Sequence, residues 1–174
     1  MRLKPIRCRG RLAPLGPRRW QDSGTSKLAA ALVCATNMPT PDWIAVLVAG
    51  LAMFLLGGLW YSPLLFARAW MPLAHPGKTE DDLRKQGAGA ASYVFAFVAG
   101  LVAIATVAYF AEAMGGGLWD GVRAGLYCAV GIVATTFGTT YLFGGKPMRL
   151  YLIDAGYQMV GLVLGGLIYG AWPW

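Results

Sequence analysis

The chain has 174 residues, of which 57% are hydrophobic and 13% are charged. This composition is too apolar for an ordinary soluble domain of the same size, and it predicts a protein that resides in lipid. A transmembrane helix needs about 20 predominantly apolar residues, so the chain has room for a handful of crossings and little else. We therefore expect one membrane domain.

The formal net charge of +7 arises in the first 37 residues, which hold eight of the fifteen lysines and arginines and one acid, Asp22. Residues 38–174 are neutral by formal count and offer no basic face for phosphates, so we expect no nucleic-acid partner. The single His75 and three scattered cysteines fit no metal site of the usual kind. Gly77-Lys78-Thr79 matches the end of a phosphate-binding loop, but Pro72 stands where the first glycine of that motif is required. We expect no metal or other cofactor.

The first membrane span is predicted over 42–61. Residues 43–60 carry no charge, and Thr40-Pro41-Asp42 suits a helix start with Thr40 as the cap. Ser62-Pro63 repeats this pattern of cap and proline. It should end the span and open a short helix whose aromatic residues suit the membrane–water interface.

Three further spans are predicted over 88–112, 118–143 and 149–172. Thr79 and Asp82 resemble a capping box before the second span, and glycine runs end the second and third. The apolar runs are continuous and do not alternate as the strands of a membrane barrel would. The sequence thus predicts an all-α fold, an integral membrane four-helix bundle with a short interfacial helix after the first span.

Small or weakly polar residues align on one face of each of the last three spans when positions are placed 100° apart. Helices in lipid associate through close backbone approach and a few hydrogen bonds, so these faces should point into the bundle and Val163 toward lipid. The same faces offer a surface for a homo-oligomer, which is the expected partner besides the lipid bilayer. They comprise Ser92, Ala96, Ala99, Ala103 and Thr106; Gly121, Gly125, Cys128, Thr135 and Thr139; and Asp154, Gln158, Gly161 and Gly165.

Residues 1–37 form a basic extension that we expect to be disordered or loosely helical, and we favour Met38 as the true start of translation. The loops at 62–87 and 144–149 carry six basic residues, whereas the second loop and the C-terminus carry Arg123 alone. By the positive-inside rule, both basic loops are cytoplasmic, and we expect the protein in a bacterial inner membrane. A translated tail with eight basic residues would oppose this orientation.

Asp154 is the main candidate for a functional residue. It lies about one and a half turns into the fourth span, on the face of Gln158, where an acid is costly unless it pairs, hydrates or protonates. The structural alternative is a hydrogen bond at headgroup level to Gln158, Tyr157 or Arg149. We favour this alternative because the position is closer to the membrane boundary than to the midplane.

Trp60, Tyr61 and Trp70 are either interfacial anchors or walls of a ligand site, and we favour anchoring because aromatic residues are common at span ends. Ser62 and Pro63 have a role in the turn.

A Ser–His–Asp hydrolase would need Ser62 or Ser92 beside His75 and Asp154, but nothing in the sequence places these residues together. We expect no enzyme. Thr135, Thr136, Thr139 and Thr140 could line a polar path, but hydrogen bonds to their own helix backbone are the commoner role.

Two parts of the chain resemble a known family. The residues Asp42-Trp43-Ile44-Ala45, Gly58-Leu59-Trp60-Tyr61-Ser62-Pro63-Leu64-Leu65-Phe66 and Trp70-Met71 are similar to the opening of the bacterial membrane-protein family called domain of unknown function 1761. Its ending is similar to Leu142-Phe143, Leu152-Ile153-Asp154-Ala155-Gly156-Tyr157 and the glycine-rich run to Trp172. The resemblance covers about 38–174 and implies a small four-helix membrane protein, with no catalytic residue to carry over.

Three hypotheses for function follow. The favoured one is a non-enzymatic membrane protein with a structural or accessory role. The alternatives are a small transporter or channel subunit that uses Asp154 and Gln158, and a lipid-active membrane enzyme.

Overall fold

The computed structural model describes residues 40–79, 82 and 89–173, and the account below concerns these residues. The expectations for residues 1–37, including a start at Met38, lie outside the described part of the chain.

Four helices in the described residues are long and apolar enough to cross a membrane. They are α2 (Trp43–Trp60), α5 (Ala90–Met114), a third span over Leu118–Phe143 and α8 (Met148–Gly170). The third span consists of α6 (Leu118–Cys128), a π-helical segment η1 (Ala129–Ala134) and α7 (Thr135–Phe143). The short helix α3 (Ala67–Ala74) follows α2. The prediction of an all-α membrane protein with four long apolar helices is confirmed.

Two predicted helix starts can be compared with the structure. The Asp42 carboxylate, and not Thr40, caps α2: it accepts from the backbone N–H groups of Ile44 at 2.8 Å and Ala45 at 3.2 Å. The predicted capping box of Thr79 and Asp82 is present. The Thr79 N–H donates to the Asp82 carboxylate at 3.0 Å, and the Asp82 N–H donates to the Thr79 hydroxyl at 3.2 Å.

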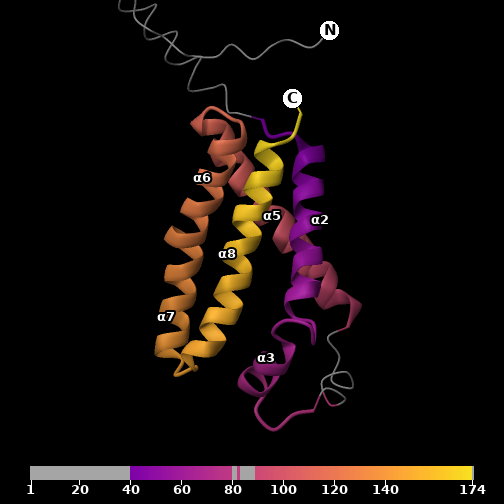
Figure 1. Cartoon of the computed structure of the whole chain (residues 1–174), viewed down its shortest axis with the longest axis vertical. Helices are drawn as coiled ribbons and strands as arrows, with labels where there is room; N and C mark the ends of the chain where they lie inside the picture. The colour runs from indigo at the N-terminus through magenta and orange to yellow at the C-terminus, as the bar shows by residue number, and fades with distance from the viewer. Residues whose placement is uncertain (1–39, 80–81, 83–88, 174) are drawn as a thin grey trace, which may run out of the picture. The chain divides into compact units, whose positions relative to one another are not determined.

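Helix α8 lies between α2 and the continuous helix of α6, η1 and α7, and it contacts every other long helix (Figure 1). The closest approach joins α6 to α8. A Cβ atom on Gly121 would collide with the carbonyl oxygen of Gly166, and one on Gly125 would lie 2.5 Å from the carbonyl oxygen of Leu162. Gly161 and Gly165 likewise leave space for side chains of α2 and α5. The predicted interior faces of α6 and α8 are therefore correct at these glycines.

The predicted interior face of α5 is wrong except at Ala103, which is half-buried and packs against the core. Ser92, Ala96 and Ala99 are exposed, whereas Ile104, Val107, Ala108 and Ala111 are buried. The stripe of small residues lies mainly in the first half of α5, and this helix buries residues only in its second half. Val163 was expected to face lipid, but it is half-buried and contacts the core.

The interior face predicted for the third span fails beyond η1. Cys128 is buried, but Thr135 and Thr139 are exposed. A π-helix turns more slowly per residue than an α-helix, so η1 shifts the face of every later residue. The Thr135 hydroxyl donates to the Gly131 carbonyl at 2.8 Å and the Thr139 hydroxyl to the Thr136 carbonyl at 3.0 Å, which is the predicted bonding of threonines to their own helix.

Candidate functional site

The Asp154 carboxylate joins three elements at one end of the bundle. The Tyr61 hydroxyl and the Trp70 indole N–H each donate to Oδ1 at 2.8 Å, and the Tyr141 hydroxyl donates to Oδ2 at 2.6 Å. These donors come from the C-cap of α2, from α3 and from α7. Asp154 itself is about 9 Å along the axis from the first residue of α8, at 1.5 Å per residue.

All three donors are neutral groups. Arg123 pairs with Asp120, and within the described residues no lysine or arginine forms an ion pair with Asp154. Arg149 precedes Asp154 by five residues and therefore lies on a different face of α8. Lys146 is nearby, but its ammonium lies 4.8 Å over the Tyr141 ring. The predicted partners Gln158, Tyr157 and Arg149 are wrong, because the carboxylate bonds instead to side chains from other helices.

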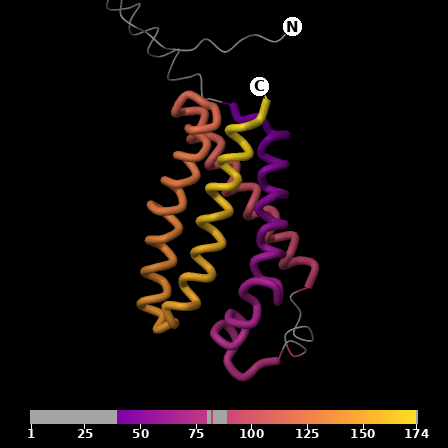
Figure 2. The backbone as a smooth tube through the Cα atoms, in the orientation of Figure 1, coloured from indigo at the N-terminus to yellow at the C-terminus, as the bar shows by residue number. Residues whose placement is uncertain are grey.

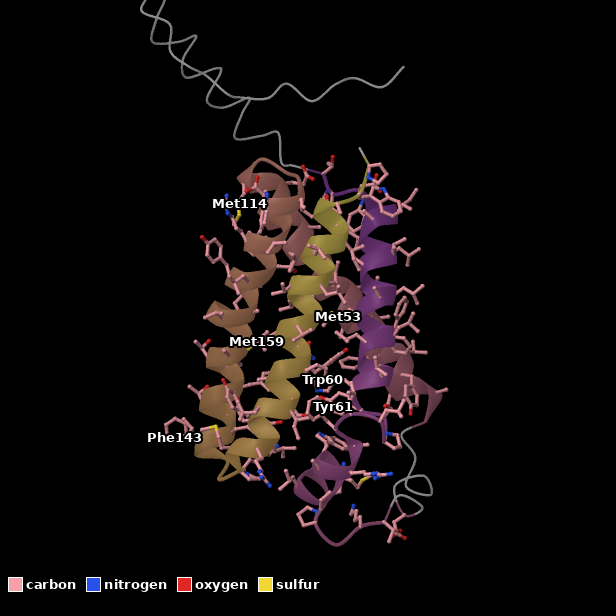
Figure 3. All side chains as sticks on the ribbon, in the orientation of Figure 1. Met53, Trp60, Tyr61, Met114, Phe143 and Met159 are labelled. Atoms are coloured by element: carbon pink, nitrogen blue, oxygen red, sulfur yellow. The ribbon has the colours of Figure 1, made fainter. Side chains whose placement is uncertain are left out.

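The aromatic residues at this end of α2 contact α8 and do not merely face the interface. The Trp60 indole N–H donates to the carbonyl of Ile153 at 3.0 Å, and Figure 3 shows Trp60 and Tyr61 at the end of α2 that adjoins α8. The Tyr61 ring lies 5.3 Å from that of Trp70 and 5.5 Å from that of Tyr157. The Tyr157 hydroxyl reaches the backbone carbonyl of Met53 at 3.4 Å.

Tyr61 follows the last residue of α2, and two effects keep its phenol protonated. Burial is the larger cause and the hydrogen bond to Asp154 the second; together they raise the pKa of Tyr61 well above its ordinary value. Tyr61 is therefore a neutral hydrogen-bond donor at physiological pH.

Ser62 and His75, two candidates for a Ser–His–Asp hydrolase, are engaged in other contacts. The Ser62 hydroxyl donates to the Leu59 carbonyl at 2.7 Å and accepts from the Leu64 N–H at 3.3 Å, and the adjacent Pro63 is exposed. The His75 ring lies edge-on to that of Trp70 at 5.4 Å. Within the described residues, no hydrogen bond joins Ser62, His75 and Asp154.

Gln158 lies one turn beyond Asp154 on the same face of α8. Its side chain is half-buried and makes no hydrogen bond to any described residue. The structure therefore does not include Gln158 in the hydrogen-bonded cluster around Asp154.

The sequence did not identify Tyr141 as part of this site. Helices α7 and α8 form a hairpin whose connection turns at Gly144 and Gly145, the latter at φ 62° (Figure 2). Tyr141 lies three residues before Gly144, and Asp154 lies nine residues after Gly145. Helical side chains lean toward the N-terminus of their helix, which on α7 is away from the turn, so the long Tyr141 side chain reaches Asp154. The short span between an aromatic residue and an acid across a glycine turn was the available signal.

A second polar cluster lies at the opposite ends of these helices. The Tyr169 hydroxyl on α8 donates to the Glu112 carboxylate at 3.0 Å and accepts from the backbone N–H of Asp42 at 3.2 Å. The Tyr169 side chain is fully buried. This cluster joins the end of α5 to the start of α2. In the described part of the chain, no three histidine, cysteine or acidic side chains lie close enough to hold a metal ion.

Of the comparisons with known proteins, one found a match. No curated protein and no solved structure matched the chain. Residues 44–170 match the family described as "Protein of unknown function (DUF1761)", a stretch that includes the Asp154 site and, apart from Trp43, all four long helices. The chain belongs to this family, DUF1761.

Proposed function

We propose that the protein is a non-enzymatic membrane protein with a structural or accessory role, in which Asp154 fastens the first loop to the helix bundle. The observation that carries this proposal is the set of three neutral donors from α2, α3 and α7 on one carboxylate. Hydrogen bonds to a charged group contribute about 1.5–3 kcal/mol each, more than neutral pairs do. A side chain with these contacts stabilises the arrangement of three elements and needs no substrate to explain it.

The orientation in the membrane is part of the same proposal. Tyr61 and Tyr141 bond to one carboxylate, so the first and third spans end on the same side of the membrane. The loops that follow them are the two basic loops, 62–87 and 144–149. The positive-inside rule then places the Asp154 end of the bundle in the cytoplasm of a bacterium, with the protein in its inner membrane.

In this proposal, the surface for a homo-oligomer lies on α5. The glycines of α6 and α8 are used for contacts inside one chain, so they are not free for a second copy. The exposed residues Ser92, Ala96 and Ala99 of α5 are the predicted small-residue surface that is still accessible.

The proposal is tested by comparing Asp154→Asn and Asp154→Ala in a strain whose deletion phenotype has been measured by growth and lipid composition. Asparagine retains the shape and most hydrogen bonds, so Asp154→Asn should keep the wild-type amount of protein in the membrane and the wild-type growth and lipid composition. Asp154→Ala should lower the amount of protein and shift growth and lipid composition toward those of the deletion strain. Normal abundance of Asp154→Asn with the full deletion phenotype would contradict a structural role.

A transporter or channel subunit is the second candidate. It is favoured by one observation: Asp154 has no cationic partner among the described residues, and the unpaired amide of Gln158 lies one turn away. An ionisable group of this kind within a span is a common feature of ion and proton pathways. If Asp154 carries a proton or cation, Asp154→Asn and Gln158→Leu should each reproduce the deletion phenotype while the amount of protein in the membrane stays normal.

A further inference from the structure

An apolar groove of about 640 Å³ runs between α2 and α5, away from the Asp154 end. Trp43, Val46 and Leu47 line it on α2, and residues between Leu101 and Tyr109 line it on α5. The hydroxyl of Thr106 in this lining donates to the carbonyl of its own helix, at Val102. The lining therefore favours a hydrocarbon chain over a polar ligand.

The depth of the groove matches one leaflet of a bilayer. Residues 101–109 span about 12 Å along α5, close to half of a hydrocarbon core about 30 Å thick. At the inner end, Gly50 allows Leu101 to approach α2 closely, because a Cβ atom at Gly50 would collide with the Leu101 side chain. At the outer end, Trp43 and Tyr109 are the amphipathic aromatic residues expected at headgroup level.

Two acids stand at this outer end. Asp42 directly precedes Trp43, and Glu112 is one helical turn beyond Tyr109. The Tyr169 hydroxyl contacts both the Asp42 backbone and the Glu112 carboxylate, so the two residues are neighbours in space. Within the described residues, neither carboxylate forms an ion pair. The Asp42 carboxylate caps α2 and the Glu112 carboxylate accepts from Tyr169, and neither residue is in the lining itself. Both residues lie next to the outer end of the groove, where their negative charge complements a headgroup that carries an ammonium.

We propose that the groove binds an acyl chain of a zwitterionic aminophospholipid, phosphatidylethanolamine, with its ammonium toward Asp42 and Glu112. An anionic phospholipid fits the same apolar lining but is repelled at the rim. One favourable charge contact at a membrane surface corresponds to a preference of about fivefold.

The test uses the full chain in detergent micelles that contain equal amounts of phosphatidylethanolamine and phosphatidylglycerol, with bound lipid measured by native mass spectrometry. Val102→Trp fills the groove from an exposed position, and Val98→Trp is a matched control one turn earlier on α5, outside the lining. We expect the wild type and Val98→Trp to retain phosphatidylethanolamine preferentially. Val102→Trp should lose bound lipid of both kinds.

The headgroup contact is tested separately with Glu112→Gln and Asp42→Asn, which keep a hydrogen-bond acceptor at each position. These variants should bind lipid but lose the preference for phosphatidylethanolamine. Equal lipid binding by Val102→Trp and Val98→Trp, or a wild type without this preference, would overturn the proposal. A shift from dimer to monomer in Val102→Trp with unchanged lipid would overturn it as well, because the occupant would then be a second copy.

Discussion

Replacement of Asp154 by alanine should weaken the attachment of α3 more than it weakens the bundle. Three hydrogen bonds to one carboxylate, at about 1.5–3 kcal/mol each, set an upper limit of about 5–9 kcal/mol for the loss of unfolding free energy. Asp154, Tyr61 and Tyr141 are only half-buried, so water takes over part of the hydrogen bonding when the carboxylate is removed, and the loss of stability is smaller than this limit. We expect a loss of about 2–4 kcal/mol for Asp154→Ala and about 1–2 kcal/mol for Asp154→Asn.

Two measurements check this expectation on the full chain in mixed micelles. Unfolding by sodium dodecyl sulfate, followed by circular dichroism, gives the change in stability. Limited digestion by trypsin at Arg68, an exposed residue within α3, reports whether this helix has been released from α8. Cleavage at Arg123, an exposed residue on α6, serves as the control for general loosening. Unchanged stability and unchanged cleavage at Arg68 in Asp154→Ala would show that the three bonds do not hold α3.

Three further predictions concern the bundle, its orientation and its first loop. Gly125→Leu should cost about 3 kcal/mol through overpacking against α8, whereas Val160→Leu at an exposed position of α8 should be nearly neutral; equal unfolding midpoints would refute the α6–α8 contact. With Cys8, Cys34 and Cys128 replaced by serine, an impermeant maleimide should label Trp119→Cys in intact cells and label Lys146→Cys only after permeabilisation, and the opposite pattern would invert the topology. The hydrogen bonds from Thr79 lower the pKa of Asp82 below its ordinary value of 3.8. Their contribution to the stability of the helix start is therefore present above that pH and is lost as the pH falls through the lowered pKa. In Thr79→Ala the pKa of Asp82, followed by NMR, should rise toward 3.8, and an unchanged pKa would exclude the capping box in solution.

The sequence was sufficient for the helices because their signal is local. Long apolar runs and the residues at their ends determine where a helix can cross a membrane, and they require no knowledge of the other helices. The capping box at Thr79 was found for the same reason. The interior faces were less predictable. A stripe of small residues shows that close approach is possible, but in α5 this stripe lies mainly where the helix has no neighbour.

The site was predicted in part for a related reason. Asp154 was identified because an acid within a span is costly, a property of one residue. Its partners depend on two features that are not local: the turn after α2, which brings Trp70 back toward α8, and the π-helical segment η1, which sets the face of α7 that carries Tyr141. An uninterrupted α-helix over 118–143 would present a different face at Tyr141, since the π-helical turn changes the phase of all later residues.

This dependence on η1 links the structural role of Asp154 to the third span. Deleting one residue within 129–134 would restore continuous α-helix while leaving the faces of both α6 and α7 where they are, because the π-helix accommodates one additional residue. The bond between Tyr141 and Asp154 should then persist, and protection of Arg68 from trypsin should match the wild type. An added residue in the same segment has no such accommodation and should rotate α7 by about 100°, which removes Tyr141 from the carboxylate. Loss of protection in the deletion would show that η1 does not accommodate one additional residue. Protection retained in the insertion would show that α7 is positioned by its other contacts and that η1 does not set its phase.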